Sequence, residues 1–221
     1  MSRIRQGAVT NINNGDTAFT VVEGLGKCLV VLIGTHQGTI STVTWNGASL
    51  TKVGEGASAF NECGDIWALM NPTAGTGNVV ISMSGGSWYG GSVLTLYNVK
   101  QVAESAIAKS TGTVNSSSPS ASITPTTANN LILCAFGGEA IFTSNQEGSF
   151  VLDYCSGQSF EGYIGLYFEQ AGADARTLQV NVASGQRFGY CIATFEPEPS
   201  INIPSFNLVG SFRTSGSSSR V

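Results

Sequence analysis

The segment WALMNPTAGTGNVVISMSGGSWYGGSVLTLYNV, residues 67–99, holds apolar runs that are separated by turn sequences. Val, Ile, Leu and aromatic residues make up the runs, and Asn, Pro, Gly and Ser lie between them. Runs of this kind are typical of β-strands, and Gly and Asn tolerate the positive φ angles that tight turns need. The segment therefore predicts successive strands that are joined by short turns.

The same pattern recurs along most of the chain. We expect strands at 17–22, 27–34, 40–46, 49–53, 65–71, 78–84, 92–99, 120–124, 130–137, 149–154, 163–169, 177–182 and 188–196. No long segment keeps the roughly 3.6-residue apolar period of an amphipathic helix. Because the apolar face of a sheet must be covered by another layer, the pattern predicts an all-β protein, a two-sheet β-sandwich with very little helix.

The two halves of the chain share an order of features at an offset of roughly 100 residues, which indicates an internal repeat. KCLVVLIGT at 27–35 corresponds to NLILCAFGG at 130–138, and residues 67–99 correspond to 165–197. Two such halves can supply the two sheets of one sandwich or form two small tandem sandwiches, and we favour one compact unit. The expected organisation is an N-terminal arm at 1–12, a sandwich at 13–199 with related halves at about 13–100 and 101–199, and a C-terminal tail at 200–221.

Both ends of the chain differ in composition from the middle. Arg3 and Arg5 give the N-terminal segment a positive charge that suits an acidic neighbouring surface. The Ser- and Gly-rich C-terminal segment cannot hold itself in a core, but it carries a short apolar patch with Phe206, Leu208 and Val209. These five residues are candidate contacts with a partner, and two frayed termini are the alternative.

The composition argues against several classes of protein. The chain has 10 Lys and Arg against 14 Asp and Glu, which gives a net charge of -4, so it lacks the basic excess of a typical nucleic-acid-binding protein. Hydrophobic residues make up 42 %, too many for an intrinsically disordered chain. The longest apolar run, CLVVLI at 28–33, is far shorter than the roughly 20 residues of a membrane-spanning helix, and no export signal is visible. We therefore expect neither nucleic acid nor a membrane as a partner.

Residues suited to catalysis or metal binding are sparse. His36 is the single histidine, and no GxSxG turn presents a serine nucleophile. The five cysteines are odd in number and lack CxxC spacing, which favours neither a disulfide framework nor a zinc site. Three of them are expected to be small buried residues: Cys28, Cys134 and Cys191. Glu62 and Asp65 are interpreted as surface carboxylates, and we expect no catalytic residue, no metal and no cofactor.

Two aromatic residues form the candidate binding site that the sequence predicts. Trp88 and Tyr89 stand in SGGSWYGGS at 84–92, where an exposed aromatic plate can stack on a sugar ring or press on another subunit. Packing in the core is the alternative for Trp88. Trp45 and Trp67 fit alternating core positions instead.

TVTWNGASLTKV at 42–53, DIWALMNPTAGTGNVVISMSGG at 65–86 and LTLYNV at 94–99 carry a resemblance to known domains. This part of the chain resembles small β-sandwich domains of bacteriophage virion proteins and of phage-related bacterial surface proteins. The likeness covers 17–99 in detail and the rest only in rhythm, and its motif positions are Trp45, Asn46, Gly47, Leu50, Trp67, Asn71, Pro72, Gly75 and Val79. In such domains the tryptophans pack inside while Asn, Gly and Pro make turns. The resemblance implies a jelly-roll-like virion or surface module and brings no catalytic residue with it.

The resulting hypothesis is a non-enzymatic structural protein of a bacteriophage virion, most simply a capsid decoration or cement protein. Such a protein is assembled in the reducing host cytoplasm, which agrees with cysteines that show no disulfide pattern. Its expected partners are the major capsid protein or other virion subunits and further copies of itself, with a trimer favoured over a dimer. A phage fibre or tail module that binds host-surface glycans and an enzyme acting on polysaccharide are the alternatives.

Overall fold

The computed structural model of the chain describes residues 3–57, 62–86, 88–138, 142–145, 153–158, 161–169, 172–182 and 186–199. The first half contains β1 (Arg5–Asn13), β2 (Thr17–Val21), β3 (Cys28–His36), β4 (Thr39–Trp45), β5 (Ala48–Ser49), β6 (Thr51–Ala57), β7 (Cys63–Met70), β8 (Gly75–Ser84) and β9 (Trp88–Tyr97). A short 3-10 turn, η1 (Glu104–Ala106), precedes the second half. That half contains β10 (Ala108–Ser116), β11 (Ser120–Ile123), β12 (Leu131–Gly138), β13 (Phe142–Asn145), β14 (Asp153–Gln158), β15 (Glu161–Glu169), β16 (Arg176–Val182) and β17 (Gln186–Phe195).

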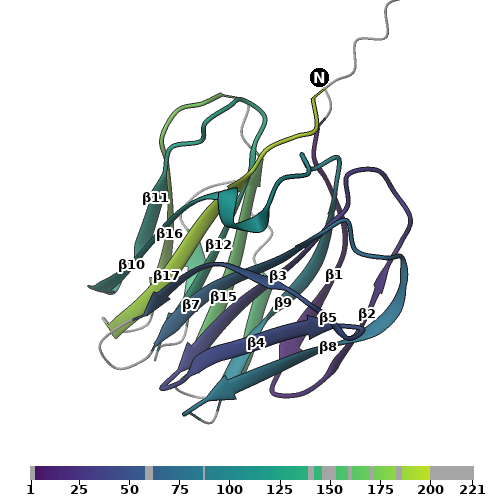
Figure 1. Ribbon diagram of the computed structural model, residues 1–221. Coiled ribbons are helices and arrows are strands. Elements are labelled where there is room, and N and C mark those ends of the chain that lie inside the picture. The colour runs from purple at the N-terminus through teal and green to yellow at the C-terminus, as the bar shows by residue number, and fades with distance from the viewer. Residues whose placement is uncertain are drawn as a thin grey trace, which may run out of the picture.

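The described strands form two sandwiches of the same design, one in each half of the chain (Figure 1). The first half has a five-stranded sheet, β1-β9-β3-β7-β6, and a smaller sheet, β2-β8-β4-β5. The second half repeats this order with β10-β17-β12-β15-β14 and β11-β16-β13. Because β1, β2, β3 and β4 alternate between the larger and the smaller sheet, as do β10 to β13, each half is wound in the manner of a jelly roll.

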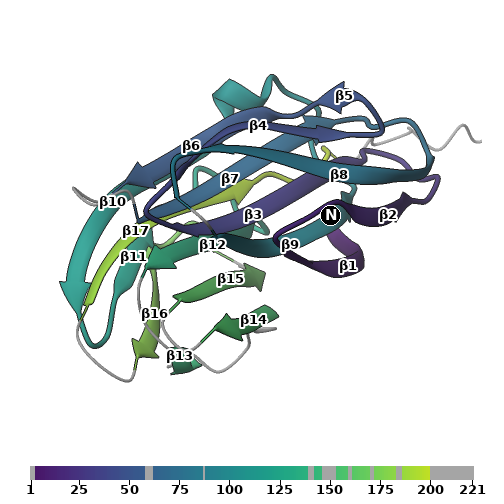
Figure 2. The same cartoon turned by 90° about the horizontal axis from the view of Figure 1, so that it is seen from below.

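The two five-stranded sheets pack face to face, so the molecule has four sheet layers in series (Figure 2). All nine residues of β3 are buried. Its residues Cys28, Val30 and Leu32 face the other half, and the alternate residues face the smaller sheet of their own half. β12 divides its side chains in the same way between the shared core and the core of the second sandwich. Continuous apolar runs are what a strand covered on both faces requires.

Glycines bring the backbones of the two large sheets into direct contact at one end of this interface. A Cβ atom added at Gly137 of β12 would lie 1.8 Å from the Cys63 carbonyl oxygen of β7. One added at Gly56 of β6 would lie 1.9 Å from the Tyr190 carbonyl oxygen of β17. No side chain fits in these gaps, so at this end of the interface the two sandwiches contact each other directly through backbone atoms.

The structure confirms the all-β sandwich class expected from the sequence and refines its layout. The sequence favoured one two-sheet unit from two related halves, whereas each half forms its own two-sheet sandwich and the pair has four sheets among the described strands. The physical reason is that runs such as those of β3 and β12 are apolar on both faces and need cover on both sides.

The expected N-terminal arm at 1–12 is corrected by the structure over the part that is described. Residues Arg5–Asn13 form β1, which pairs along β9, and Ile12 is completely buried. β1 could not be recognised as a strand from its polar sequence. It is an edge strand that pairs on one side only, so it does not need a continuous apolar run. β10 was not predicted either, because its residues alternate between half-buried and exposed and it has no fully buried apolar face.

Four of the motif positions named from the sequence have the structural roles expected of them. Trp45 is buried at 2 % exposure and donates a hydrogen bond from Nε1 to the Phe19 carbonyl oxygen at 3.3 Å. Asn46, Gly47 and Asn71 adopt left-handed φ angles of 47°, 79° and 49°, which close the turns after β4 and β7. Among the described residues, no helix is long and apolar enough to cross a membrane.

Candidate functional site

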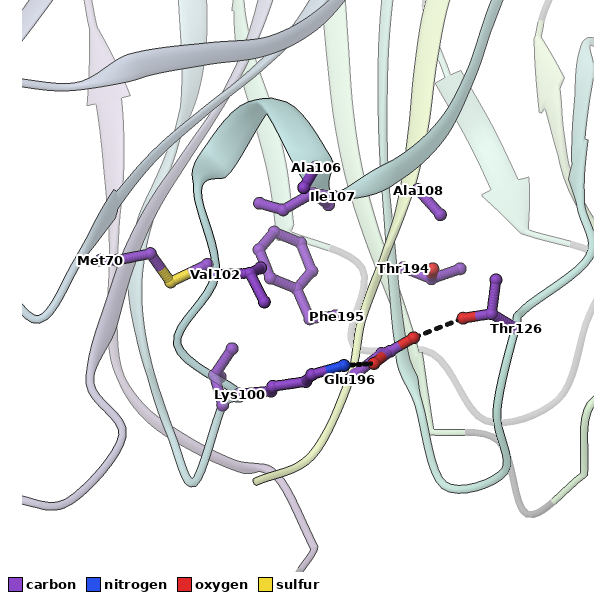
Figure 3. Close-up of a pocket in the computed structure, with 11 residues that line it drawn as sticks. Met70, Lys100, Val102, Ala106, Ile107, Ala108, Thr126, Thr194, Phe195 and Glu196 are labelled. Carbon is purple, nitrogen blue, oxygen red and sulfur yellow. Dashed lines mark hydrogen bonds and ion pairs between the residues drawn. The ribbon is translucent and has the colours of Figure 1, made fainter. Parts of the chain in front are cut away.

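The candidate site is a cavity of about 210 Å³ at the end of the interface between the two sandwiches. It lies where residues 98–108 pass from β9 to β10 and cover the end of β17 (Figure 3). Figure 3 shows its 11 lining residues, with the Phe195 ring beside Val102 and close to Ile107. The cavity therefore draws its walls from both halves of the chain and from the segment that connects them.

Backbone hydrogen bonds fix the connecting segment against the end of β17. The Lys100 amide donates to the Glu196 carbonyl oxygen at 2.9 Å, and the Glu198 amide donates to the Asn98 carbonyl oxygen at 2.7 Å. The 3-10 turn is held from the other side, because Glu104 Oε1 accepts a hydrogen bond from the Met70 amide at 2.9 Å. Backbone hydrogen bonds and the Glu104 carboxylate thus hold in place the segment that covers the cavity.

An ion pair lines one side of the cavity. Lys100 Nζ lies 2.8 Å from Glu196 Oε2, and the Thr126 hydroxyl donates a hydrogen bond to Glu196 Oε1. The hydrogen bonds from Lys100 and Thr126 lower the pKa of Glu196, and the hydrogen bond to Glu196 raises the pKa of Lys100. At neutral pH both groups are therefore charged and satisfied by each other, which leaves the carboxylate poorly suited to accept a proton from a substrate.

The remaining wall is apolar, with one exception. Phe195 and Ile107 are buried at 1 % and 5 % exposure, and Val102 is half-buried. Thr194 also belongs to the lining, but it pairs opposite Ile132, so its side chain lies on the face of β17 that covers the core of the second sandwich, where its buried hydroxyl has no hydrogen-bond partner among the described residues. Such a site suits a small apolar group, with the ion pair at its edge.

A second polar cluster lies inside the first sandwich, and it corrects the interpretation of Glu62 and Asp65 as surface carboxylates. Glu62 is 3 % exposed and Asp65 is fully buried. Lys52 Nζ lies 3.7 Å from Asp65 Oδ2, pairs closely with Glu55 and stands over the Trp67 ring. Burial raises the pKa of Asp65 to about 7, and the nearby Lys52 lowers it only in part.

Trp88 and Tyr89, the aromatic candidates from the sequence, are buried at 5 % and 8 % exposure. Trp88 belongs to the core between the two large sheets, which confirms the core alternative for this residue. The Tyr89 hydroxyl accepts a hydrogen bond from the Gly15 amide at 3.0 Å, and its own amide donates to Asn14 Oδ1 at 2.8 Å. Neither ring presents a face on which a sugar could stack.

The candidate contacts at the termini fall into two groups. The Arg5 guanidinium lies 5.9 Å from the centre of the Tyr97 ring, and the Arg3 carbonyl accepts a hydrogen bond from Asn98 Nδ2 at 3.0 Å. Both arginines are exposed but belong to a segment that is held against β9. Phe206, Leu208 and Val209 lie outside the described residues.

The cavity has no direct signal in the sequence, because its lining residues come from four separate parts of the chain. The one indication was that residues 100–122 keep an alternating pattern and do not have the composition of a clean linker. Cys28, Cys134 and Cys191 are free and buried, as expected. Within the ranges that the structure describes, no three His, Cys, Asp or Glu side chains come together as metal ligands would.

Comparison of the chain with known protein families, with curated proteins and with solved structures finds no match. The description of the chain therefore rests on its own fold, a jelly-roll-like double sandwich, and on the largely apolar cavity at the junction of its halves.

Proposed function

We propose that this protein is a structural protein of a bacteriophage virion, a capsid decoration protein that binds on the outside of the shell. The observation that carries the proposal is the direct backbone contact between the two large sheets at Gly137 and Gly56. Two sandwiches that touch through backbone atoms over a shared apolar core cannot hinge without separating that core. A stiff block is what bracing capsid subunits requires.

The edge of the second sandwich supplies a suitable attachment surface. β10 pairs with β17 on one side, and no other described strand pairs with it. Its odd-numbered residues, among them Thr111 and Thr113, are exposed. A nine-residue edge strand without proline is a template onto which a strand of a neighbouring protein can pair. The resemblance of residues 17–99 to phage virion domains supports a capsid subunit as that neighbour.

The test is co-sedimentation of the full-length protein with isolated phage capsids that lack it. We expect saturable binding by the parent chain. The double variant Thr111→Lys and Thr113→Lys should bind at least tenfold more weakly, since lysines on an edge strand oppose the approach of another strand. Asn78→Lys with Ser82→Lys is the matched control, because it adds the same charge to the exposed face of β8.

The outcomes separate cleanly. Binding by the parent and the β8 control but not by the β10 variant supports both the decoration role and the β10 edge. Equal binding by all three proteins contradicts attachment through β10. If the parent does not bind capsids at any concentration, the decoration function is wrong.

A further inference from the structure

We infer that the folded chain forms an amide bond between the side chains of Lys52 and Asp65, a covalent link from β6 to β7 inside the first sandwich. The reaction needs an amine, an uncharged carboxyl group, a nearby base and the exclusion of water from the carboxyl group. One cluster supplies all of these: Lys52, Glu55, Asp65 and Trp67. The inference goes beyond the proposed function, because it concerns a single chain and requires no capsid.

The Lys52 amine is held against the Asp65 carboxyl group. Its Nζ atom lies 3.7 Å from Asp65 Oδ2 and donates a hydrogen bond to the Ile40 carbonyl oxygen at 3.1 Å. The same atom lies 5.0 Å from the centre of the Trp67 ring. Groups that a fold holds at about 3–3.5 Å react far faster than the same groups free in solution. The Lys52 side chain is partly exposed and has several rotatable bonds, so a small adjustment brings Nζ to that distance from the carboxyl carbon.

Asp65 is a buried acid whose oxygens are not engaged elsewhere. Its side chain is fully buried, and neither oxygen has a hydrogen-bond partner among the described residues. Burial raises the pKa of Asp65 to about 7, so a large fraction of this carboxyl group is uncharged at neutral pH. The uncharged form is the one that an amine can attack, because the negative charge of a carboxylate repels the lone pair of the nitrogen. The buried position therefore keeps Asp65 in its reactive form.

Glu55 is placed to move the protons, because it pairs closely with Lys52 and lies opposite Asp65 in the register of β6 and β7. Its carboxylate accepts a proton from the Lys52 ammonium group, and the lone pair of the amine attacks the Asp65 carboxyl carbon. A C–N bond forms, the C–OH bond breaks, and the hydroxyl group leaves as water with one of the two protons that the nitrogen gives up. The other proton passes from Glu55, which is partly exposed, to the solvent. The reaction needs neither an oxidant nor a reductant.

The bond fastens a strand that has few other attachments in its own sheet. Among the described strands, β6 lies at the edge of the five-stranded sheet and pairs with β7 alone. The register of this pair shifts between Lys52 and Gly54, which interrupts the ladder of hydrogen bonds beside the link. The same strand carries Gly56, whose backbone touches that of Tyr190 in the second sandwich. A covalent link between β6 and β7 therefore secures one of the contacts between the two halves.

The first test is the intact mass of the full-length protein after prolonged incubation near neutral pH. We expect the mass of the sequence minus one water molecule. Lys52→Arg should show the full mass of its own sequence, because a guanidinium group is a poor nucleophile, although its charge still pairs with Glu55. Lys100→Arg is the matched control and should still lose water, since Lys100 forms an equally simple ion pair with Glu196 at 2.8 Å. A parent chain with the full mass of its sequence shows that the inference is wrong.

Proteolysis of the denatured chain locates the bond. Trypsin does not cut after a lysine whose amine is part of an amide, so residues 28–100 should remain one peptide that is lighter by one water molecule. Cleavage after Glu55 or Glu62, which lie between the linked residues, should leave the fragments joined. Loss of water together with normal cleavage after Lys52 would place the dehydration elsewhere, for example in a cyclic imide of another aspartate, and would overturn the inference.

The role of Glu55 is tested by the rate at which newly synthesised chains lose water. Glu55→Gln keeps the size of the side chain but cannot accept the proton, and it should slow the reaction roughly 100-fold. Glu23→Gln removes the partner of another lysine, Lys27, and should react at the rate of the parent. Equal rates for all three proteins would contradict proton transfer through Glu55. Chains that have not yet reacted are recognised by their full mass, and only these keep an Asp65 carboxyl group that titrates. None of these experiments contains capsids, so their failure leaves the decoration proposal intact.

Discussion

Replacement of the buried acid Asp65 by asparagine should stabilise the protein at pH 8 and should have a much smaller effect at pH 4. The carboxyl group of Asp65 is fully buried, and neither of its oxygens has a hydrogen-bond partner among the described residues. Burial raises its pKa from 3.8 to about 7 in the folded protein, against the opposing influence of Lys52 at 3.7 Å.

The magnitude follows from the linkage between proton binding and folding. Well below pH 4 the carboxyl is protonated in both states, and its ionisation then contributes nothing to the difference in free energy between them. Between about pH 4 and 7 the unfolded chain loses this proton while the folded protein keeps it, so the free energy of unfolding falls as the pH rises. At about 1.4 kcal/mol for each pKa unit, the full loss above pH 7 is about 4 kcal/mol. The amide of the Asp65→Asn variant would not titrate and would avoid this loss.

The assay is urea unfolding of the parent and of Asp65→Asn between pH 4 and 8.5, followed by tryptophan fluorescence. The free energy of unfolding of the variant relative to the parent should grow by about 4 kcal/mol across that range. Asp16→Asn is the matched control, because Asp16 is exposed. A difference between Asp65→Asn and the parent that is the same at pH 4 and at pH 8 would refute the reasoning and would mean that Asp65 is ionised beside Lys52 in the folded protein.

Three further predictions concern single contacts. Gly137→Ala should destabilise the protein by about 3 kcal/mol in urea unfolding, because the added Cβ would lie 1.8 Å from the Cys63 carbonyl oxygen. The control Gly47→Ala has open space around the added Cβ but a φ of 79°, so it should cost only about 1 kcal/mol. Equal losses for the two variants would contradict the close contact between the sheets. Tyr89→Phe should lower the unfolding free energy by about 1 kcal/mol through the lost hydrogen bond to Gly15, and an unchanged value would show that water replaces it at no cost. Lys100→Met should lower the free energy of unfolding only slightly at pH 7, because the Lys100 side chain is exposed to solvent. Since the pKa of Glu196 is lowered in the folded protein, this small loss should be present above pH 4.5 and disappear as the pH falls further. A loss that persists at pH 2 would point to lost packing instead.

Much of the fold could be predicted from local sequence because the central strands carry strong signals. The runs that become β3 and β12 are apolar at nearly every position, and the turns after β4 and β7 contain the Asn and Gly residues that left-handed φ angles require. The edge strands β1 and β10 were not predicted, because a strand that pairs on one side and faces solvent keeps a polar sequence. Their strand character follows from their partners, β9 and β17.

The candidate site was beyond the reach of sequence reasoning for a related reason. Trp88 and Tyr89 looked like an exposed plate because glycines and serines surround them, yet those glycines allow close packing of β9 and both rings are buried. Asp65 was interpreted as a surface acid because carboxylates are seldom buried, yet its position on β7 places it inside the first sandwich. Burial of one residue depends on what packs over it, and that information is distributed over the whole chain.

The sequence by itself determined the all-β class, the turn positions and the buried cysteines, because each of these depends on residues that are neighbours along the chain. It also showed the repeat of two related halves, because the order of features can be compared without knowing which surfaces meet. Only the tertiary structure decided that the halves pack face to face as two sandwiches, that Asp65 is buried, and that a cavity opens where residues 98–108 cross the end of β17. These features arise from contacts between residues that are distant in sequence, and local composition does not encode which distant surfaces meet.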